Sequence, residues 1–487
     1  MRRRLLCGAL LLGLAAPAFA QVSALQPPPG ANPPAPEPTP VVRLAVKPGA
    51  PEESALRYAL LPDPLDCKPG NAAPIWIRAG DAVHSNAHKI TEKEEKWYGP
   101  ADTPLKDFPA EKVRDFLSTY ATALRLADQA ARRDHCDWEL PPLTIQDFDL
   151  PFEEIQHCRG LAGILVLRYR LELSEGRFDD AIRTLQTGFA LARDLGKGDT
   201  LIQDLVGIAI GSIMFGHVEE WLQTPGAPNL FWALTDLPAP LVNTAPAVRS
   251  ELTTLYRSFP PLREVLRRSD KGALSEEDAN RIIAELYKDW GAYIGQDVPD
   301  WQRKLGAAAL VLKAYPDAKK YLKKQGRTDE QVDAMPAAQV VLLYFVGQYD
   351  KIKDDFLKWM NVPPWQARAG MMEAEKEVRA LGPNGNPIIS LLMPAVEKVY
   401  EARIRIERTA DYLRCAEALR FYAAAHDGKP PEKLEDVKLP LPVDPNTGES
   451  FGKFYKVDKD GTGVFEIPPP PNMPPSLGRR FLLAPPK

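Results

Sequence analysis

Apolar residues recur at steps of three and four along most of this chain, the period of an α-helix that buries one face. In residues 110–133 the apolar positions include Val113, Phe116, Tyr120 and Leu124. The same period continues in residues 159–173, 178–195, 200–222, 247–259, 275–290, 301–314, 329–359 and 387–426. We therefore expect a mainly α protein, whose helices pair in a solenoid-like array of helix hairpins.

The pattern changes after Asp427-Gly428, a dipeptide that ends a helix because glycine readily adopts positive φ. Residues 451–457 and 463–467 are short β-prone segments, and a turn sequence precedes each of them. A β-hairpin is stable when it packs on another element. We expect residues 386–467 to form a small C-terminal α+β module, in which this hairpin packs on the long helix.

Prolines cluster at both ends of this chain of 487 residues. Eight of the fourteen positions in 27–40 are proline. Each proline fixes φ and removes an N–H donor, so we expect residues 21–50 to be an extended tether. The alternative interpretation is a proline-rich ligand for an aromatic groove. The prolines of residues 468–487 predict a disordered tail, which leaves residues 51–385 as a helical domain.

The first twenty residues have the pattern of a secretory signal peptide. Arginines at positions 2–4 precede a short apolar run, Leu5–Ala16, and the small-x-small triplet Ala18-Phe19-Ala20 follows. We expect cleavage after residue 20 and export to a periplasmic or extracellular space. A retained membrane anchor is the alternative, although the run is shorter than the roughly 20 residues that span a bilayer.

The charge and apolar content limit the partners of the exported chain. Removal of residues 1–20 lowers the basic count from 61 to 58 against 65 acidic residues. An acidic protein lacks the clustered positive charge that nucleic acid requires, so we expect no nucleic-acid partner. The apolar runs 205–216 and 337–346 are too short to span a membrane, and we interpret them as buried core helices. A protein or a peptide remains as the expected partner.

Four cysteines remain after residue 20: Cys67, Cys136, Cys158 and Cys415. In an oxidising compartment they allow three disulfide pairings. We favour a disulfide between Cys136 and Cys158, because a loop and the start of a helix could meet there. Four buried free thiols are the alternative, since free cysteine is often buried.

The histidines suggest two metal sites by residue type, but each set lacks a feature that a zinc site requires. His84 and His88 are four residues apart, but a third ligand is missing. The dipeptides His135-Cys136 and His157-Cys158 would suit zinc, but they lack the usual spacer between ligands. The sequence also lacks Gly-x-Ser-x-Gly, His-Glu-x-x-His, Cys-x-x-Cys and a phosphate loop. We therefore expect no bound metal and no cofactor, and we assign no catalytic residue.

Several segments resemble a family of uncharacterised exported bacterial proteins. They are Leu56–Pro62, Pro69–Ala73, Cys136–Trp138, Gly176–Ala209 and Ala416–Pro431, which together span most of the chain after the signal peptide. The resemblance implies an exported protein, and it implies no activity because the family has none assigned.

Two shorter stretches are similar to known structural units. Gly176-x-Phe178-x-x-Ala181 resembles the turn of a tetratricopeptide hairpin, although no 34-residue period is visible elsewhere. Residues 386–467 resemble the globular part of type II secretion pseudopilins, with a long helix, a short helix at 432–437, an Asp-Pro-x-x-Gly turn and a hairpin. The charged helix of this chain departs from the apolar first helix of a pilin.

Three functions are compatible with these observations. The leading hypothesis is a non-catalytic protein-binding or scaffold protein of the cell envelope, because helix hairpins form binding surfaces and no catalytic motif is present. An exported hydrolase, with a site assembled from separate helices, is the first alternative. A pseudopilin-like scaffold associated with the secretion machinery is the second. A pocket that holds ionisable groups with shifted pKa values would favour the hydrolase.

Overall fold

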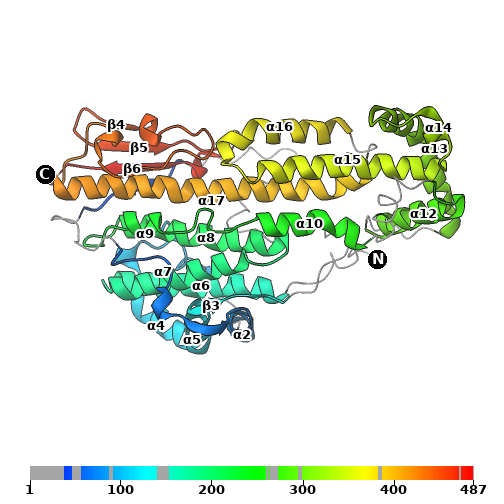
Figure 1. The fold of residues 1–487 in the computed structure, drawn as a ribbon. Helices are drawn as coiled ribbons and strands as arrows, with labels where there is room; N and C mark the ends of the chain where they lie inside the picture. Colours follow the sequence, from blue (N-terminus) through cyan, green and yellow to red (C-terminus); the bar gives the residue numbers. More distant parts are fainter. Residues whose placement is uncertain are drawn as a thin grey trace, which may run out of the picture.

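The computed structural model describes residues 38–46, 56–86, 92–139, 153–258, 262, 273–293, 299–381, 386–470 and 473–485. The protein is mainly helical, with a small sheet that involves its C-terminal end, as the sequence predicts (Figure 1). The signal peptide and tether residues 21–37 and 47–50 lie outside the described residues. Their predicted roles stay predictions.

The helices of the first half pack around one hydrophobic core. They are α2 (Ala73–Ser85), α3 (Glu92–Glu95), α4 (Ala110–Ser118), α5 (Ala121–Ala131), α6 (Glu153–Ser174), α7 (Phe178–Leu195), α8 (Leu201–Leu222) and α9 (Phe231–Thr235). Gly176, with φ of +70°, makes the tight turn between α6 and α7. A Cβ on Gly207 would lie 2.8 Å from the carbonyl oxygen of Ala192, so only glycine lets α8 approach α7 this closely. Phe189 and Phe215 meet between these two helices, 4.9 Å apart.

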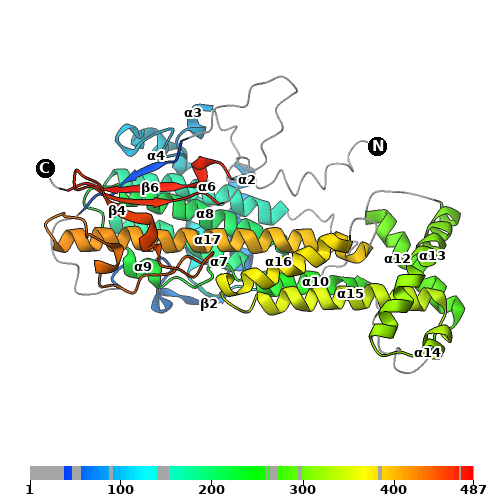
Figure 2. The ribbon, with the colours of Figure 1, turned by 90° about the horizontal axis from the view of Figure 1, so that it is seen from above.

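The helices of the second half surround a separate core. They are α10 (Ala245–Ser258), α12 (Glu276–Tyr293), α13 (Asp300–Lys324), α14 (Asp329–Asp333), α15 (Ala337–Trp359) and α16 (Pro364–Leu381). The central helix α15 buries Val341, Phe345 and Tyr349, and α12–α14 form the end of the molecule farthest from the sheet (Figures 1 and 2).

The long helix α17 (Pro387–Ala425) joins the two cores. Its first part, with Val396 and Val399, belongs to the core of α10–α16, and its later part, with Leu413 and Leu419, belongs to the core of α2–α9. The sheet lies on one side of the later part, and α8 and α9 lie on the other (Figure 1). The change between cores therefore falls inside α17, after the predicted boundary at residue 386.

The main sheet has the strand order β1-β6-β5-β4. Its strands are β1 (Val41–Arg43), β4 (Tyr455–Val457), β5 (Gly463–Ile467) and β6 (Arg479–Leu483). The predicted hairpin is present as β4 and β5, although residues 451–454 form a 3₁₀ turn. Phe465 lies opposite Phe481 in the sheet, and Tyr412 of α17 packs 5.7 Å from Phe481. A smaller parallel pair joins β2 (Lys68–Asn71) to β3 (Arg133–His135).

Two sequence predictions about the proline-rich ends are wrong. Residues 468–487 were expected to be a disordered tail, but Arg479–Leu483 forms β6 and pairs with both β5 and β1. Residues 21–50 were expected to be a tether, but Val41–Arg43 forms β1, with Val42 beside Phe481. The prolines flank two short apolar strands, and pairing between opposite ends of the chain stabilises both strands.

Helix α8 is the one described helix that is long and apolar enough to cross a membrane by composition. In the structure 72% of that apolar window is buried, and α8 packs on α6, α7 and α17. Most of the apolar surface of α8 is therefore buried against these helices.

Candidate functional site

An open groove of about 660 Å³ lies between α4 and the segment around Trp97. Three aromatic side chains form one wall: the Trp97 and Phe116 rings meet edge to face at 6.0 Å, and Phe116 lies 5.2 Å from Tyr120. Trp97 and Tyr120 are almost fully buried, whereas Phe116 is half-buried and therefore still presents surface to a ligand. This wall offers a rigid apolar surface.

The rim of the groove is polar and carries both signs of charge. Lys112 and Asp115, one turn apart on α4, are exposed, and the half-buried Glu94 of α3 also lines the groove. Within the described residues, neither Lys112 nor Asp115 forms an ion pair. An apolar wall beside available charges suits an extended peptide, whose side chains and backbone need both kinds of contact.

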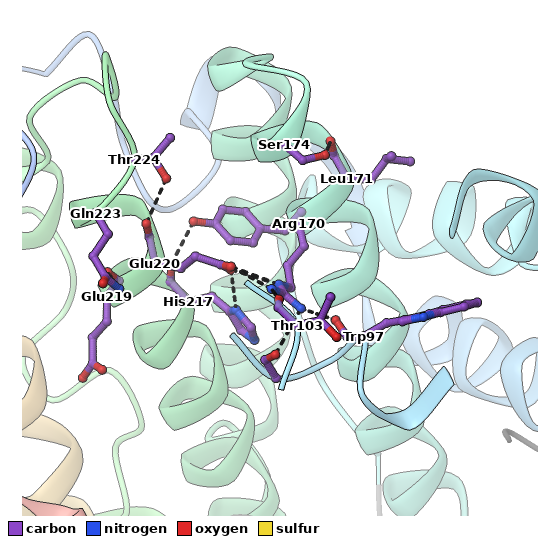
Figure 3. A network of polar contacts seen from close by, with 12 residues as sticks. Trp97, Thr103, Arg170, Leu171, Ser174, His217, Glu219, Glu220, Gln223 and Thr224 are labelled. Atoms are coloured by element: carbon purple, nitrogen blue, oxygen red, sulfur yellow. Dashed lines mark hydrogen bonds and ion pairs between the residues drawn. The ribbon is translucent and has the colours of Figure 1, made fainter. Parts of the chain in front are cut away.

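A buried arginine holds the segment that supplies Trp97. The Arg170 side chain, from α6, has no exposed surface. Its Nη1 donates to the carbonyl oxygens of Trp97 and Gly99, and its Nη2 donates to the carbonyl oxygen of Thr103 (Figure 3). The guanidinium also lies over the ring of Phe108, 4.9 Å from its centroid. One cation therefore fixes residues 97–103 against α6.

Glu220 of α8 balances the charge of Arg170. Arg170 Nε donates to both Glu220 carboxylate oxygens, at 3.2 and 3.1 Å, and Nη2 donates to Oε1 at 2.9 Å. His217 Nδ1 lies 3.5 Å from the same carboxylate (Figure 3). Burial alone would raise the pKa of Glu220, but the hydrogen bonds from His217 and Arg170 bring this pKa below its usual value. The pair is therefore charged at neutral pH, and it links α6 and α8 to the wall of the groove.

A second buried ion pair, between Arg420 and Glu417 of α17, also holds other segments of the chain in place. Arg420 Nη1 donates to Glu417 at 2.8 Å, and Nη2 donates to the carbonyl oxygen of Ala227 at 2.8 Å. Arg420 Nε donates to the carbonyl oxygen of Ala45 at 2.7 Å. This pair fixes the segment after β1 and the segment before α9 to the long helix.

Besides Glu417 and Glu375, whose pKa values burial also raises, four buried or half-buried carboxyl groups have raised pKa values, and each belongs to helix packing away from the groove. Burial raises the pKa of Glu172, Glu251 and Asp411 to about 7. Burial also raises the pKa of Asp204 well above its usual value, and nearby Asp199 adds to the effect. These carboxyl groups stand on α6, α10, α17 and α8 respectively, and none of them lines the groove.

The predicted disulfide between Cys136 and Cys158 is wrong, because both residues are free thiols. Cys136 follows β3 and lies near Asp194 at the end of α7. Cys158 is buried within α6 where that helix meets Gly80 of α2, and burial raises its pKa to about 12. The two thiols therefore have different neighbours. Cys67 and Cys415 are free as well. The alternative expectation of four buried thiols is also wrong, because Cys67 and Cys136 are only half-buried.

The structure places the histidines in new pairings. His84 stacks on His157, with ring centroids 4.0 Å apart, and His157 Nδ1 lies 2.8 Å from Asp81. His135 Nδ1 instead contacts Asp134 at 2.8 Å. His88, the expected partner of His84, lies outside the described residues. Among the residues that the structure describes, no group of three or more metal-ligating side chains occurs.

The sequence did not identify the groove or the Arg170–Glu220 pair. Phe116 and Tyr120 were assigned to one face of a single helix over residues 110–133, but the chain breaks at Thr119–Tyr120 into α4 and α5. Thr119 and Tyr120, the two residues at that break, both line the groove. A usable signal for Arg170 did exist: it lies in the mainly apolar stretch Leu161–Leu173, together with Arg168 and Glu172, and charges in such a stretch need partners.

No known protein family, no curated protein and no solved structure matches this chain. The resemblances to the exported bacterial family, the tetratricopeptide turn and the pseudopilins stay predictions. What the groove does must therefore be inferred from its own residues.

Proposed function

We propose that this chain is a non-catalytic exported protein of the cell envelope that binds an extended peptide segment of another protein in the groove beside α4. The observation that carries the proposal is an open groove with an aromatic wall, both signs of charge on its rim, and a buried ion pair behind it. The pair holds Trp97 in place before any ligand arrives. Preorganisation of this kind lowers the entropic cost of binding.

The chemistry around the groove favours binding over hydrolysis. A hydrolase requires a nucleophile within hydrogen-bond reach of a base, with donors that stabilise the developing charge. The carboxyl groups with raised pKa values belong to the packing of other helices, and Lys112 and Asp115 on the rim are exposed. Aromatic rings with mixed charges are instead the usual composition of a peptide-binding surface.

The proposed location is based on residues 1–20. Three arginines, a short apolar run and Ala18-Phe19-Ala20 match a cleavable export signal. We expect N-terminal sequencing of the protein purified from its native cells to give a first residue of Gln21. A first residue of Met1 on protein from the cytosolic fraction would contradict export.

Peptide selection tests the binding function. We expect a random peptide library panned on the purified protein to yield sequences that bind it, and Phe116→Ala to weaken the binding of these peptides about tenfold. Phe116 is half-buried, so the variant should fold. Binding is measured by isothermal titration with each selected peptide.

Leu65→Ala is the matched control, because Leu65 is 93% exposed and lies outside the groove. It should leave the affinity unchanged. Selected peptides that bind the Phe116→Ala variant as tightly as the unmodified protein would contradict the proposal, and so would the failure to select any peptide.

A further inference from the structure

The part of the chain that precedes β1 has the composition of a ligand for an aromatic groove. Residues 21–37 contain six prolines and a single charged side chain, that of Glu37. Prolines at this density favour the polyproline II conformation, which leaves the backbone carbonyl oxygens without internal hydrogen bonds. Cleavage after residue 20 would make these residues the N-terminus of the protein. We call residues 21–37 the proline segment.

The proline segment joins the fold at an edge of the main sheet. The carbonyl oxygen of Pro40 accepts a hydrogen bond of 3.0 Å from the backbone N–H of Arg480, and the edge strand β1 follows. Arg479, the neighbour of Arg480, donates through Nε to Glu219 of α8 at 2.7 Å. The end of the segment is therefore fixed beside α8.

The same region of α8 is connected to the wall of the groove. Glu220, which follows Glu219, pairs with Arg170, and Arg170 binds the carbonyl oxygen of Trp97 (Figure 3). An arginine–carboxylate contact separates two Cα atoms by about 10 Å, so this series of contacts puts Trp97 within roughly 40 Å of Pro40. Helix α4 also lies on the side of the sheet where β1 is the edge strand (Figure 2).

The length of the proline segment is sufficient to reach the groove. In the polyproline II form its residues span about 50 Å, at about 3.1 Å per residue. This span exceeds the distance between Pro40 and Trp97, so several residues remain to lie against the aromatic wall. The segment is fixed at one end only, and no part of the sheet has to move for it to arrive there.

The groove provides the contacts that a proline-rich chain needs. Phe116 stands half-buried in the aromatic wall, 6.0 Å from the Trp97 ring and 5.2 Å from the Tyr120 ring. Grooves with aromatic walls are the usual docking sites of polyproline II segments. The exposed Lys112 on the rim offers a donor to their carbonyl oxygens. A nearly uncharged segment also avoids repulsion on a rim that carries both Lys112 and Asp115.

We propose that the proline segment occupies the groove beside α4 of its own chain and competes there with the partner peptide. This inference rests on the proposed function, because it assigns an internal competitor to the same groove. The attachment at Pro40 gives the segment an effective concentration on the order of 1 mM, so weak contacts suffice to hold it. The apparent affinity of a partner then falls in proportion to the fraction of molecules whose groove is free.

A labelled synthetic peptide of residues 22–37 provides the probe. It is added to the chain of residues 21–487 with its natural segment, and to a serine version of the same length. The serine version carries serine at six positions: Pro27, Pro28, Pro29, Pro33, Pro34 and Pro36. We expect the probe to bind the serine version at least about tenfold more tightly, as measured by fluorescence anisotropy, because the groove of that version is free.

Two variants of the serine version locate the binding. Phe116→Ala should weaken the binding of the probe about tenfold, because it removes the exposed part of the aromatic wall. Leu65→Ala is the matched control outside the groove, and it should leave the affinity unchanged. Binding of the probe that is indifferent to Phe116→Ala would overturn the inference.

Three further results would overturn the inference. They are equal affinity of the probe for the natural and serine versions, no binding of the probe to the serine version, and a dimer in sedimentation that the serine changes abolish. The dimer would assign the segment to the groove of a second copy. The proposed function has its own test: it stands if library peptides selected on the serine version bind it and lose affinity on Phe116→Ala, and it fails if they do not.

Discussion

Arg170→Met will lower the free energy of unfolding by about 3–5 kcal/mol, the usual cost of leaving one member of a buried ion pair without its partner. The substitution leaves the Glu220 carboxylate buried without its main cation, and it removes the donors to the carbonyl oxygens of Trp97 and Thr103. Urea unfolding followed by circular dichroism measures the loss. Amide exchange should become faster in residues 97–103, because Arg170 is what fixes them to α6.

Two further variants separate the charge from the packing. Adding Glu220→Leu to Arg170→Met should restore the part of the stability that the unpaired carboxylate costs, while the carbonyl oxygens of residues 97–103 stay unsatisfied. Arg281→Met removes an arginine that pairs with Asp278 and Glu285 at the surface, and it should leave stability unchanged. A loss below about 1 kcal/mol for Arg170→Met, the range of surface pairs, would contradict the role given to this residue.

Asp204→Leu will raise the free energy of unfolding by about 1–3 kcal/mol at neutral pH, because the natural residue is a buried carboxyl group that has no hydrogen-bond partner among the described residues. Asp204 lies within α8, and both of its carboxylate oxygens are shielded from solvent. A leucine of similar reach removes the desolvation cost and adds apolar contact. Urea unfolding at fixed pH measures the gain.

The pH dependence of stability identifies the same carboxyl group. Its pKa in the folded protein is raised, so above the unfolded value of about 3.9 the unfolded chain releases a proton that the folded chain retains. Stability conferred by protonated Asp204 is therefore lost as the pH rises from about 4 through the raised pKa. Asp204→Asn cannot titrate, so its stability relative to the unmodified protein should increase with pH. A difference between the two proteins that stays constant over this range would contradict the assignment.

Much of the fold could be predicted because helical periodicity is a local property. The apolar steps in residues 178–195 and 200–222 gave α7 and α8 almost to the residue. The end of the helical pattern at residue 427, followed by two short β-prone segments, predicted the hairpin of β4 and β5. Strand β6 was missed because its five residues stand among prolines, and its stability comes from β5 and from β1 at the other end of the chain.

The candidate site was less predictable because it depends on contacts between distant residues. Arg170 and Glu220 are 50 positions apart, and their pairing follows from how α6 packs on α8. The aromatic wall brings Trp97 against Phe116, from separate segments. The disulfide prediction was wrong for the same kind of reason: the spacing of Cys136 and Cys158 does not show which helices each thiol contacts.

Amide hydrogen exchange, measured on the protein alone and with a selected peptide bound, tests the role of the groove most directly. We expect the peptide to slow exchange in residues 85–86, 94–97 and 112–120, which contain the residues that line the groove, and to leave residues 301–315 of α13 unchanged. Protection that falls only outside residues 85–86, 94–97 and 112–120 would contradict the proposal that this groove binds the peptide.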